Sequence, residues 1–339
     1  MKRFPLPDLL KGFAVFLIVP VHIIETFIDY PGRESLFGKV LLLLGGPVGV
    51  PVFMMVMGYF IAKSKKKSWQ TLIRGIKVFL LGLLLNIGLN ANLLIKIKYA
   101  GWQINPLEYI WGVDIFYLAG LSIVVLAFLK DLVKGRALLA FILAFLVLVL
   151  TDPMNNFLTI TERNYILPFI AGTYSWAYFP LFPWLAYPLF GFAFFYSEES
   201  IVRFYSAHKL IRIAILAVAG FFVVLFGQWG IRTTINLPDY YHHTFWFAMW
   251  GMAVIVMWVV FLRFLVQKYP SSIIGNFLKW LGKNITQFYV IQWLIIGNIA
   301  TAIYQTQAIN TYVYWYGGIF AVTILLTWLL EKANIKLAR

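Results

Sequence analysis

The chain has 339 residues, of which 62% are hydrophobic and only 12% carry a charge, and its mean hydropathy is +0.82. Soluble domains carry roughly 25% charged residues, so this composition excludes an ordinary water-exposed surface and indicates an integral membrane protein. The absence of cysteine excludes disulfides, thiolate metal sites and a cysteine nucleophile. The net charge of +15 does not indicate nucleic-acid binding, because the sequence offers no soluble domain on which to mount a basic patch.

Apolar runs long enough to cross a bilayer, about 20 residues each, follow one another along the chain. In chain order they cover residues 9–29, 39–62, 72–90, 112–129, 137–151, 179–196, 210–228, 244–265, 284–304 and 312–330. The first follows Lys2 and Arg3 without a cleavage site, and we interpret it as an uncleaved span. We therefore expect an all-α fold, a polytopic membrane bundle of about ten transmembrane helices.

Basic residues alternate between the loops that join these runs. The N-terminus, the C-terminus and the loops after the second, fourth, sixth and eighth runs hold 21 of the 28 Lys and Arg residues. The intervening loops hold Arg33, Lys39, Lys96, Lys98, Arg163 and Arg232. Because cytoplasmic loops are enriched in Lys and Arg, both termini are predicted to be cytoplasmic.

Aromatic residues and prolines gather in the outer loops 91–111 and 152–178 and at the start of the sixth run, where Trp184 lies. An aromatic belt at the membrane interface accounts for them. The alternative is a re-entrant lining over a cavity, because aromatic faces suit sugar rings and acyl chains. This alternative makes Trp184 a candidate for substrate binding.

Polar residues form a stripe along the first span. Lys11 and His22 are eleven positions apart, which places them within roughly 20° on the helical wheel and about 16 Å apart along the axis. Asp8 lies one turn before Lys11, and Glu25 and Asp29 follow His22 on the same side. The stripe thus carries a cation near the cytoplasm and an imidazole with carboxylates toward the outside, and at its outer end Asp29 is a candidate for substrate binding.

The cost of intramembrane polarity decides between two interpretations of this stripe. Asp8, Lys11, Glu25 and Asp29 can be the solvated flanks of the span, with His22 a hydrogen-bonded core residue. A charged group at a helix centre costs about 2.5–3.5 kcal/mol, so polar residues inside a span usually face the bundle interior or a watery cavity. His22 lies within the apolar run, and for it we favour a functional role.

The first span resembles the opening motif of the acyltransferase-3 family of membrane acyltransferases, in the run Asp8-x-x-Lys11-Gly12-x-Ala14-x7-His22. In that motif a basic residue, commonly Arg, precedes the histidine by eleven positions; Lys11 departs from the usual Arg. Other stretches are similar to the related heparan-α-glucosaminide N-acetyltransferase group. They are Pro51–Tyr59, Arg74-Gly-Ile-Lys77 through Asn86, Phe179–Gly191 and Leu281-Gly-Lys-Asn284.

The resemblance implies a single transmembrane acyltransferase domain over residues 1–339, which moves an acyl group, typically acetyl, from cytoplasmic acetyl-CoA to an extracytoplasmic sugar. The acceptor would be a hydroxyl or amine of a carbohydrate or glycolipid, and we expect the bacterial cytoplasmic (inner) membrane. Lys11, Arg74 and Lys77 would hold the phosphates of CoA. For Arg74 and Lys77 the alternative is ordinary cytoplasmic flank. The oligomeric state is left open.

His22 is then the expected general base, or the nucleophile of an acyl-imidazole intermediate. Glu25, one turn away, and Asp114, at the start of the fourth span, are candidates to orient its ring. Asp114 is equally well explained as a helix N-cap. No metal site is expected.

A second outer cluster, Asp239 to His243, enters the eighth span. His242 and His243 point about 100° apart on a helix, so a shared ligand and a zinc site are disfavoured. An interfacial girdle explains them, with Asp239 capping the helix; contact with the acceptor or with the oxyanion is the functional alternative. The mid-span amides Asn86, Gln292 and Asn298 are predicted to bond helix to helix.

Two other classes of protein share parts of this pattern. A secondary transporter or flippase for a small or lipid-linked substrate would also show intramembrane charges. A structural or sensor protein explains the spans but not the stripe on the first of them. Release of free CoA thiol from acetyl-CoA distinguishes a transferase from both.

Overall fold

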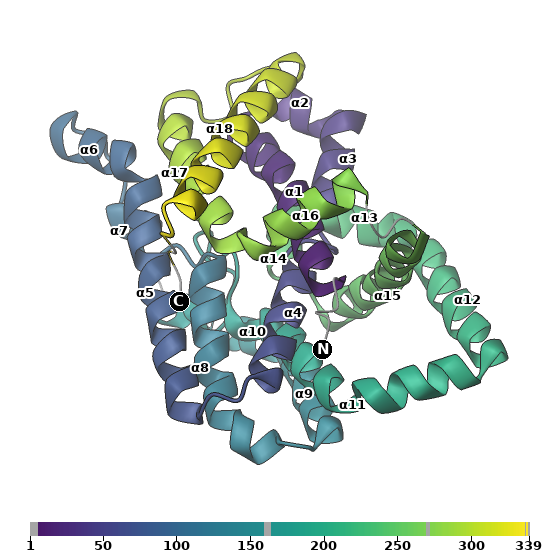
Figure 1. Cartoon of the computed structure of the whole chain (residues 1–339). Helices are drawn as coiled ribbons and strands as arrows, with labels where there is room; N and C mark the ends of the chain where they lie inside the picture. Colours follow the sequence, from purple (N-terminus) through teal and green to yellow (C-terminus); the bar gives the residue numbers. More distant parts are fainter. Residues whose placement is uncertain (1–5, 159–163, 269–271, 336, 338–339) are drawn as a thin grey trace. The chain divides into compact units, whose positions relative to one another are not determined.

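The computed structural model describes residues 6–158, 164–268, 272–335 and 337, and the elements within them are helices. They cluster into two compact units, each assembled from separated stretches of the chain. The first comprises Met1–Gly49, Leu83–Gly112 and Leu262–Arg339, and the second Val50–Gly82 and Val113–Phe261. Two long helices, α5 (Ser68–Leu89) and α15 (Phe245–Lys268), begin in the second unit and end in the first (Figure 1). The all-α prediction is confirmed.

The first unit combines the two ends of the chain. Besides the end of α5 and the end of α15, it holds α1 (Leu6–Thr26), α2 (Tyr30–Glu34), α3 (Leu36–Gly45), α6 (Ala91–Tyr99), α7 (Pro106–Ile110), α16 (Ile273–Lys283), α17 (Ile285–Ile303), η2 (Ile309–Thr311) and α18 (Tyr312–Lys332). Helix α1 packs against α3, α16, α17 and α18, and Figure 1 shows its purple ribbon beside α16 and α17. The N-terminal helix is therefore the centre of this unit.

Helices α1 and α16 touch backbone to backbone at Gly12. A Cβ atom at this position would overlap the carbonyl oxygen of Leu278. Small residues at a helix interface let membrane helices approach closely enough for extensive van der Waals contact. Gly12 therefore sets how closely α16 packs against the helix that carries His22.

Beyond its last turn, α1 continues into a short extended segment paired with the connection between α17 and α18. The Gln305 N–H donates to the Thr26 carbonyl, and the Gln307 N–H donates to the Phe27 carbonyl, each at 2.9 Å. A parallel bridge joins Ile28 to Gln307. This pairing ties the end of α1 to the end of α17.

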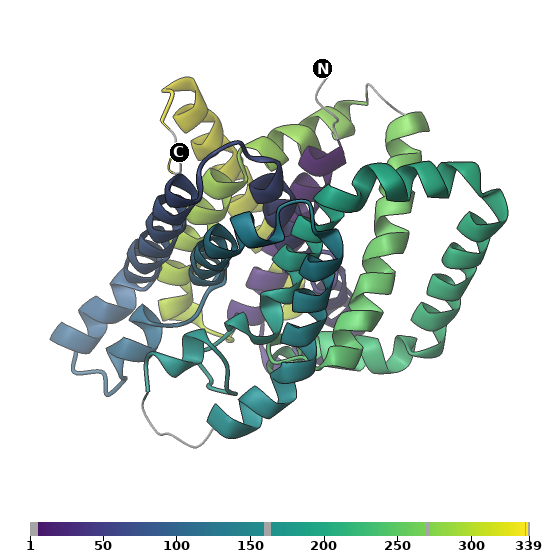
Figure 2. The ribbon, with the colours of Figure 1, turned by 90° about the horizontal axis from the view of Figure 1, so that it is seen from below.

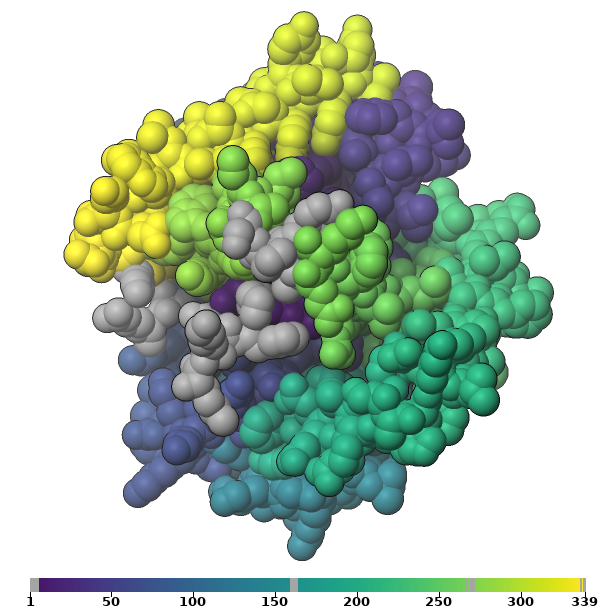
Figure 3. Space-filling view, turned by 45° about the vertical axis from the view of Figure 1, so that its right-hand side comes forward, coloured from purple at the N-terminus to yellow at the C-terminus, as the bar shows by residue number. Residues whose placement is uncertain are grey.

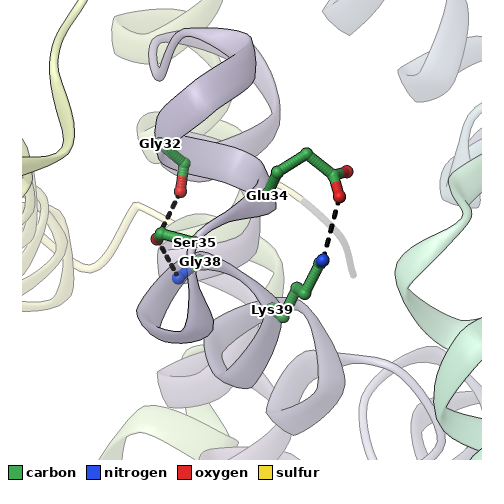
Figure 4. A network of polar contacts seen from close by, with 5 residues as sticks. All are labelled: Gly32, Glu34, Ser35, Gly38 and Lys39. Atoms are coloured by element: carbon green, nitrogen blue, oxygen red, sulfur yellow. Dashed lines mark hydrogen bonds and ion pairs between the residues drawn. The ribbon is translucent and has the colours of Figure 1, made fainter.

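Ser35 makes the corner between α2 and α3 (Figure 4). Its hydroxyl donates to the Gly32 carbonyl at 2.6 Å and accepts from the Gly38 N–H at 3.1 Å, as an N-cap residue does. Glu34 and Lys39 pair across the same corner at 2.9 Å. In the space-filling view of Figure 3, the side chains of α18 (yellow) adjoin those of α2 and α3 (purple) on this unit.

The second unit is built around α4 and α11. Besides the first part of α5 and most of α15, it holds α4 (Val50–Lys63), α8 (Ile115–Val133), α9 (Ala137–Leu158), η1 (Leu167–Phe169), α10 (Leu181–Trp184), α11 (Ala186–Ala207), α12 (Lys209–Leu225), α13 (Gly227–Ile235) and α14 (Leu237–Tyr241). Helix α11 packs against α4 and α9. A Cβ at Gly58 of α4 would overlap the Pro188 carbonyl of α11, so this pair is also in backbone contact.

Eight helices among the described residues are long and apolar enough to cross a membrane. They are Leu6–Thr26, Leu36–Lys63, Ser68–Leu89, Ile115–Val133, Ala137–Leu158, Phe245–Leu265, Ile285–Ile303 and Ile309–Lys332. These correspond to eight of the predicted runs. The runs 179–196 and 210–228 correspond to α11 and α12, which meet the same criterion only as a pair bent by 106°.

Helix α11 has 22 residues but carries Glu198, Glu199 and Arg203 in its second half, whereas α12 is short. Helix α12 has 17 residues, about 26 Å at 1.5 Å per residue, and a hydrocarbon core is about 30 Å thick. Figure 2 shows α11 and α12 turning sharply into each other. A polytopic helical membrane protein is confirmed: the described part of the chain holds eight helices long and apolar enough to cross a bilayer, or nine if the bent pair is one span.

The sidedness of the termini stays a prediction. Several cations on which it depends lie outside the described residues: Lys2, Arg3, Arg163, Lys336 and Arg339. The outer loop 152–178 is likewise described only in part, because residues 159–163 fall outside.

Candidate active site around His22

His22 is buried on α1, with 7% of its surface exposed, and its ring is held by Gln292 of α17. The imidazole Nδ1 lies 2.9 Å from the amide Nε2 of Gln292 and 3.3 Å from its Oε1. Gln292 itself is fully buried. A polar group buried without a partner is costly, so this contact explains how the first span tolerates an imidazole at this depth.

Two aromatic rings of α17 enclose the imidazole. The Trp293 ring centroid is 4.2 Å from that of His22, and the Tyr289 centroid is 6.0 Å away with the rings near perpendicular. Tyr289, Gln292 and Trp293 follow the i, i+3, i+4 spacing of one helix face. The indole Nε1 of Trp293 is buried and has no hydrogen-bond partner. One face of α17 therefore supplies a clamp for His22.

The sequence singled out only part of this clamp. Gln292 was identified as a mid-span amide that bonds between helices, and the structure confirms that role. The sequence alone does not identify His22 as the partner of Gln292, and it does not indicate that Tyr289 and Trp293 contact the imidazole. Their spacing on the face of Gln292 was the one available signal.

At the N-terminal end of α1, Lys11 pairs with Asp8. The Nζ–Oδ1 distance is 3.1 Å, and the two side chains are 16% and 5% exposed. The cation of the predicted stripe is therefore largely sheltered and has a carboxylate beside it. Lys11 and His22 share this helix and belong to the same unit.

At the C-terminal end of α1, Gln305 joins several polar groups. Its Nε2 donates to the Glu25 carbonyl and to the Tyr304 hydroxyl at 3.1 Å each, and its Oε1 accepts from Arg33 at 3.1 Å. Gln305 has a φ of 55°, which non-glycine residues adopt at an energetic cost. Burial, with Glu25 nearby, raises the pKa of Tyr304. The sequence alone did not predict this cluster of polar groups around Gln305.

Asp29 has a defined structural role. Its carboxylate accepts the Gly32 N–H at 2.9 Å and caps α2. A helix N-cap of this kind contributes about 1 kcal/mol. The substrate-binding role that we predicted for Asp29 would have to compete with this bond.

Trp184 and His243 belong to one buried aromatic cluster in the second unit. The Trp184 indole donates to the Tyr241 carbonyl at 2.8 Å. His243 donates from Nδ1 to the Tyr240 carbonyl at 2.8 Å, because a carbonyl only accepts, and its Nε2 accepts from the Tyr187 hydroxyl at 2.9 Å. Both ring nitrogens are thus occupied. Burial, as the main cause, lowers the pKa of His243 to about 4, so its imidazole is neutral near pH 7.

His242 differs from its neighbour. Its Nδ1 is buried and has no hydrogen-bond partner. Burial lowers the pKa of His242 to about 4, and a hydrogen bond with the backbone of Tyr174 opposes the shift. Of the two adjacent histidines, His242 is the one with an unused ring nitrogen.

The remaining predicted site residues also lie in the second unit. Asp114 is at the N-cap position of α8, but its carboxylate makes no capping hydrogen bond there. Arg74 and Lys77 are exposed side chains three positions apart on the first part of α5, a spacing that places them on one face. Lys11 and His22 belong to the first unit. In the described parts of the chain, no three His, Asp or Glu side chains are grouped to hold a metal ion.

Comparison with known proteins adds one finding. A family model described as an acyltransferase domain matches residues 5–332, nearly the whole chain. No curated protein and no solved structure matches the chain.

Proposed function

This chain belongs to the acyltransferase-3 family of membrane acyltransferases, and from that membership we propose that it acetylates an extracytoplasmic sugar or glycan with cytoplasmic acetyl-CoA as donor. It is a multi-pass integral membrane protein, as its apolar helices and its family require. The family match over residues 5–332 supports treating residues 1–339 as one transmembrane acyltransferase domain. The bacterial cytoplasmic membrane is the proposed location.

One observation carries the assignment of the reactive group. His22 is a buried imidazole on a membrane helix, held through Nδ1 by Gln292. When one ring nitrogen is bonded to the protein, the other is oriented for chemistry, as in other histidine bases. Nε2 of His22 is the atom that we assign to proton transfer.

In the proposed reaction, His22 acts as the general base. The acceptor oxygen or nitrogen attacks the thioester carbon while its proton passes to Nε2 of His22. The carbon–sulfur bond then breaks, and the proton moves from Nε2 to the sulfur, which releases CoA as the free thiol. In the variant with an acyl-imidazole, Nε2 attacks the thioester carbon, the carbon–sulfur bond breaks and CoA leaves as the thiolate. The acceptor then takes the acyl group from the ring, and its proton passes to the thiolate, which gives free CoA thiol.

For the donor we propose Lys11, Arg74 and Lys77 as partners of the CoA phosphates. Charge-assisted hydrogen bonds to phosphate are among the stronger polar contacts in proteins. The Lys11–Asp8 pair, at 3.1 Å, holds the lysine in place before the phosphate arrives. Arg74 and Lys77 support the proposal through their exposure and their common helix face.

We propose that the acceptor binds near His242, His243, Asp29 and Trp184. His242 supports this best, because its Nδ1 has no partner within the protein. His243 and Trp184 spend their polar atoms on internal bonds, so they would shape the site and not bond to the sugar. We propose Glu25 and Asp114 as the residues that orient the His22 ring. Glu25 follows His22 by about one turn of α1, so both side chains project from the same side of the helix.

The test uses the purified full-length chain in proteoliposomes with acetyl-CoA labelled in the acetyl group. Free CoA thiol and label in a panel of glycans and glycolipids are measured together. We expect thiol release to depend on an acceptor, and His22→Ala to abolish both signals. Full turnover by His22→Ala would overturn the proposal, and solute movement without thiol release would identify a transporter.

A histidine outside the proposed site provides the control. His208 is exposed in the bend between α11 and α12, and its Nδ1 contacts the Phe204 carbonyl. His208→Ala is expected to keep wild-type turnover. Acetyl label that stays on the protein in a quenched reaction, and is missing from His22→Ala, would select the acyl-imidazole route over direct transfer.

A further inference from the structure

The contact between His22 and Gln292 joins two residues that are 270 positions apart. Both side chains are buried, at 7% and 0% exposed. A side-chain amide presents an acceptor oxygen and two N–H donors, and it carries no charge. Such a group can therefore form a hydrogen bond to an imidazole without stabilising the protonated, positively charged ring as a carboxylate would.

The amide can meet Nδ1 with either end. Its Nε2 and Oε1 lie 2.9 Å and 3.3 Å from the ring nitrogen. When Nδ1 is bare, the amide N–H donates to it and the ring carries its proton on Nε2. When Nδ1 is protonated, Oε1 accepts from it and Nε2 carries a lone pair. The orientation of the amide therefore determines which of the two tautomers it can bond.

We propose that Gln292 is the positioning residue for His22 and that the base is active with the amide turned toward the ring by its oxygen. In that orientation Oε1, which lies 3.3 Å from Nδ1 in the structure, accepts the Nδ1–H hydrogen bond and leaves the Nε2 lone pair free for the acceptor's proton. This inference rests on the proposed role of His22 as a base. Gln292 touches neither donor nor acceptor in this scheme and acts through the ring that it holds.

The chemistry of the site explains why an amide suits this position. A carboxylate beside Nδ1 would stabilise the imidazolium, which has no lone pair with which to accept a proton. A neutral amide orients the ring without that penalty. Trp293 and Tyr289, at ring-centroid distances of 4.2 and 6.0 Å, limit the ring's rotation.

Other titratable groups on α1 and on the helices packed against it define the background for any pH measurement. They are Asp8, Lys11 and Glu25 on α1, Lys39 on α3, Lys279 and Lys283 on α16, Tyr289 on α17, and Tyr312, Tyr314, Tyr316, Glu331 and Lys332 on α18. Tyr289 has a ring contact with the imidazole. Each of these groups is unchanged in variants of Gln292.

The decisive experiment observes the ring directly. The chain has four histidines, so uniform ¹⁵N-histidine labelling gives few imidazole signals, and His22→Ala assigns those of His22. Spectra of the full-length protein across a pH series are compared for wild type, Gln292→Leu and Gln292→Glu. Bare and protonated ring nitrogens have distinct ¹⁵N shifts, so each tautomer is read from the spectrum.

For Gln292→Leu we expect a mixture of tautomers, and for the near-isosteric Gln292→Glu an imidazolium that persists to higher pH than in wild type. The matched control is Gln287→Leu, which removes a buried amide of the same helix that donates to the Ile335 carbonyl. It should leave the His22 signals unchanged. Gln292→Glu keeps the test valid if Gln292→Leu does not fold, as judged by size-exclusion elution.

Turnover gives the functional arm, with the acceptor that takes up label in the preceding assay. Gln292→Leu is expected to lower kcat about 10- to 100-fold with KM little changed, because orientation of the base is lost while binding is kept. In Gln292→Glu the acidic limb of the kcat profile should move up by about one pH unit or more.

The outcomes separate this inference from the function on which it rests. Unchanged His22 spectra in both Gln292 variants would overturn the positioning role, as would wild-type kcat in Gln292→Leu alongside an inactive His22→Ala. Full activity of His22→Ala would overturn the proposed function instead, while the spectra would still report whether Gln292 sets the tautomer.

Discussion

Two buried histidines show how the same residue type serves different ends. His243 has both ring nitrogens bonded, one to the Tyr240 carbonyl and one to the Tyr187 hydroxyl. His22 has Nδ1 bonded to an amide and aromatic rings on its sides. The first arrangement uses both nitrogens of the imidazole to hold other parts of the chain, whereas for the second we propose proton transfer through Nε2. Partners, and not burial alone, separate the two.

The burial of His243 predicts that the stability of the folded protein depends on pH. Burial lowers the pKa of His243 in the folded protein to about 4, below its ordinary 6.5. Between these values the unfolded chain binds a proton that the folded chain does not, so stability falls as the pH drops from about 6.5 to 4. A pKa shift of this size can lower the free energy of unfolding by at most about 3 kcal/mol. His242, shifted in the same direction, adds to the effect.

The apparent Tm of the purified protein, measured at several pH values between 4 and 7.5, tests this loss of stability. His243→Gln should lower the apparent Tm at pH 7, because it disturbs the Tyr187 and Tyr240 bonds, and should flatten the decline at acid pH. His208→Gln, at an exposed position, should leave the slope unchanged. An equally steep decline in His243→Gln would contradict the prediction.

At the scale of elements, close helix contacts place the candidate site. Helix α1 meets α16 at Gly12 and α17 at His22, and the extended segment after α1 pairs with residues 305–307. Three different interactions thus hold one helix: backbone packing, a buried polar bond and main-chain pairing. Disturbing one of them is expected to shift the clamp around His22.

Substitution at Gly12 tests the first interaction. A side chain there would collide with the Leu278 carbonyl, so Gly12→Val should destabilise the protein by about 1–3 kcal/mol and lower turnover. The control is Gly318→Ala on α18, where an added Cβ has no neighbour within 4 Å. A lower apparent Tm in Gly12→Val alone is expected. Equal melting of both variants would mean that α1 and α16 tolerate separation.

At the scale of the whole chain, orientation in the membrane follows from charge. The loops assigned to the cytoplasm hold 21 of the 28 basic residues, and this asymmetry predicts two cytoplasmic termini. The donor proposal requires the same orientation, because Lys11 must face the compartment that supplies acetyl-CoA. Topology and mechanism are therefore linked.

Single cysteines test this orientation without any background substitution, since the chain contains none of its own. Lys65→Cys, in the loop before α5, should be shielded in intact cells from a membrane-impermeant maleimide. Gln103→Cys, between α6 and α7, should be labelled from outside. Both should react after the membrane is opened. The opposite pattern would reverse the topology and the assigned donor side.

Hydropathy, loop charge and local motifs are properties of short stretches, and for that reason the sequence by itself determined much about this protein. It identified an all-helical membrane protein, the span with its polar stripe, His22 and the family resemblance. It predicted separate spans at 179–196 and 210–228, where the structure has one bent pair of helices, because apolar runs look alike in sequence whether or not the chain bends sharply between them. The 106° bend between α11 and α12 is a tertiary feature.

Only the tertiary structure decided which residues meet. The partner of His22 lies 270 positions away, and nothing in the local pattern of either span specifies how α1 rotates against α17. The ring contacts of Tyr289 and Trp293 with His22 are made where these two helices meet. The tertiary structure likewise shows that His243, which the sequence suggested as a contact for the acceptor, has both ring nitrogens bonded within the protein. Local composition determines where helices form, whereas the fit of their surfaces determines which polar atoms they share.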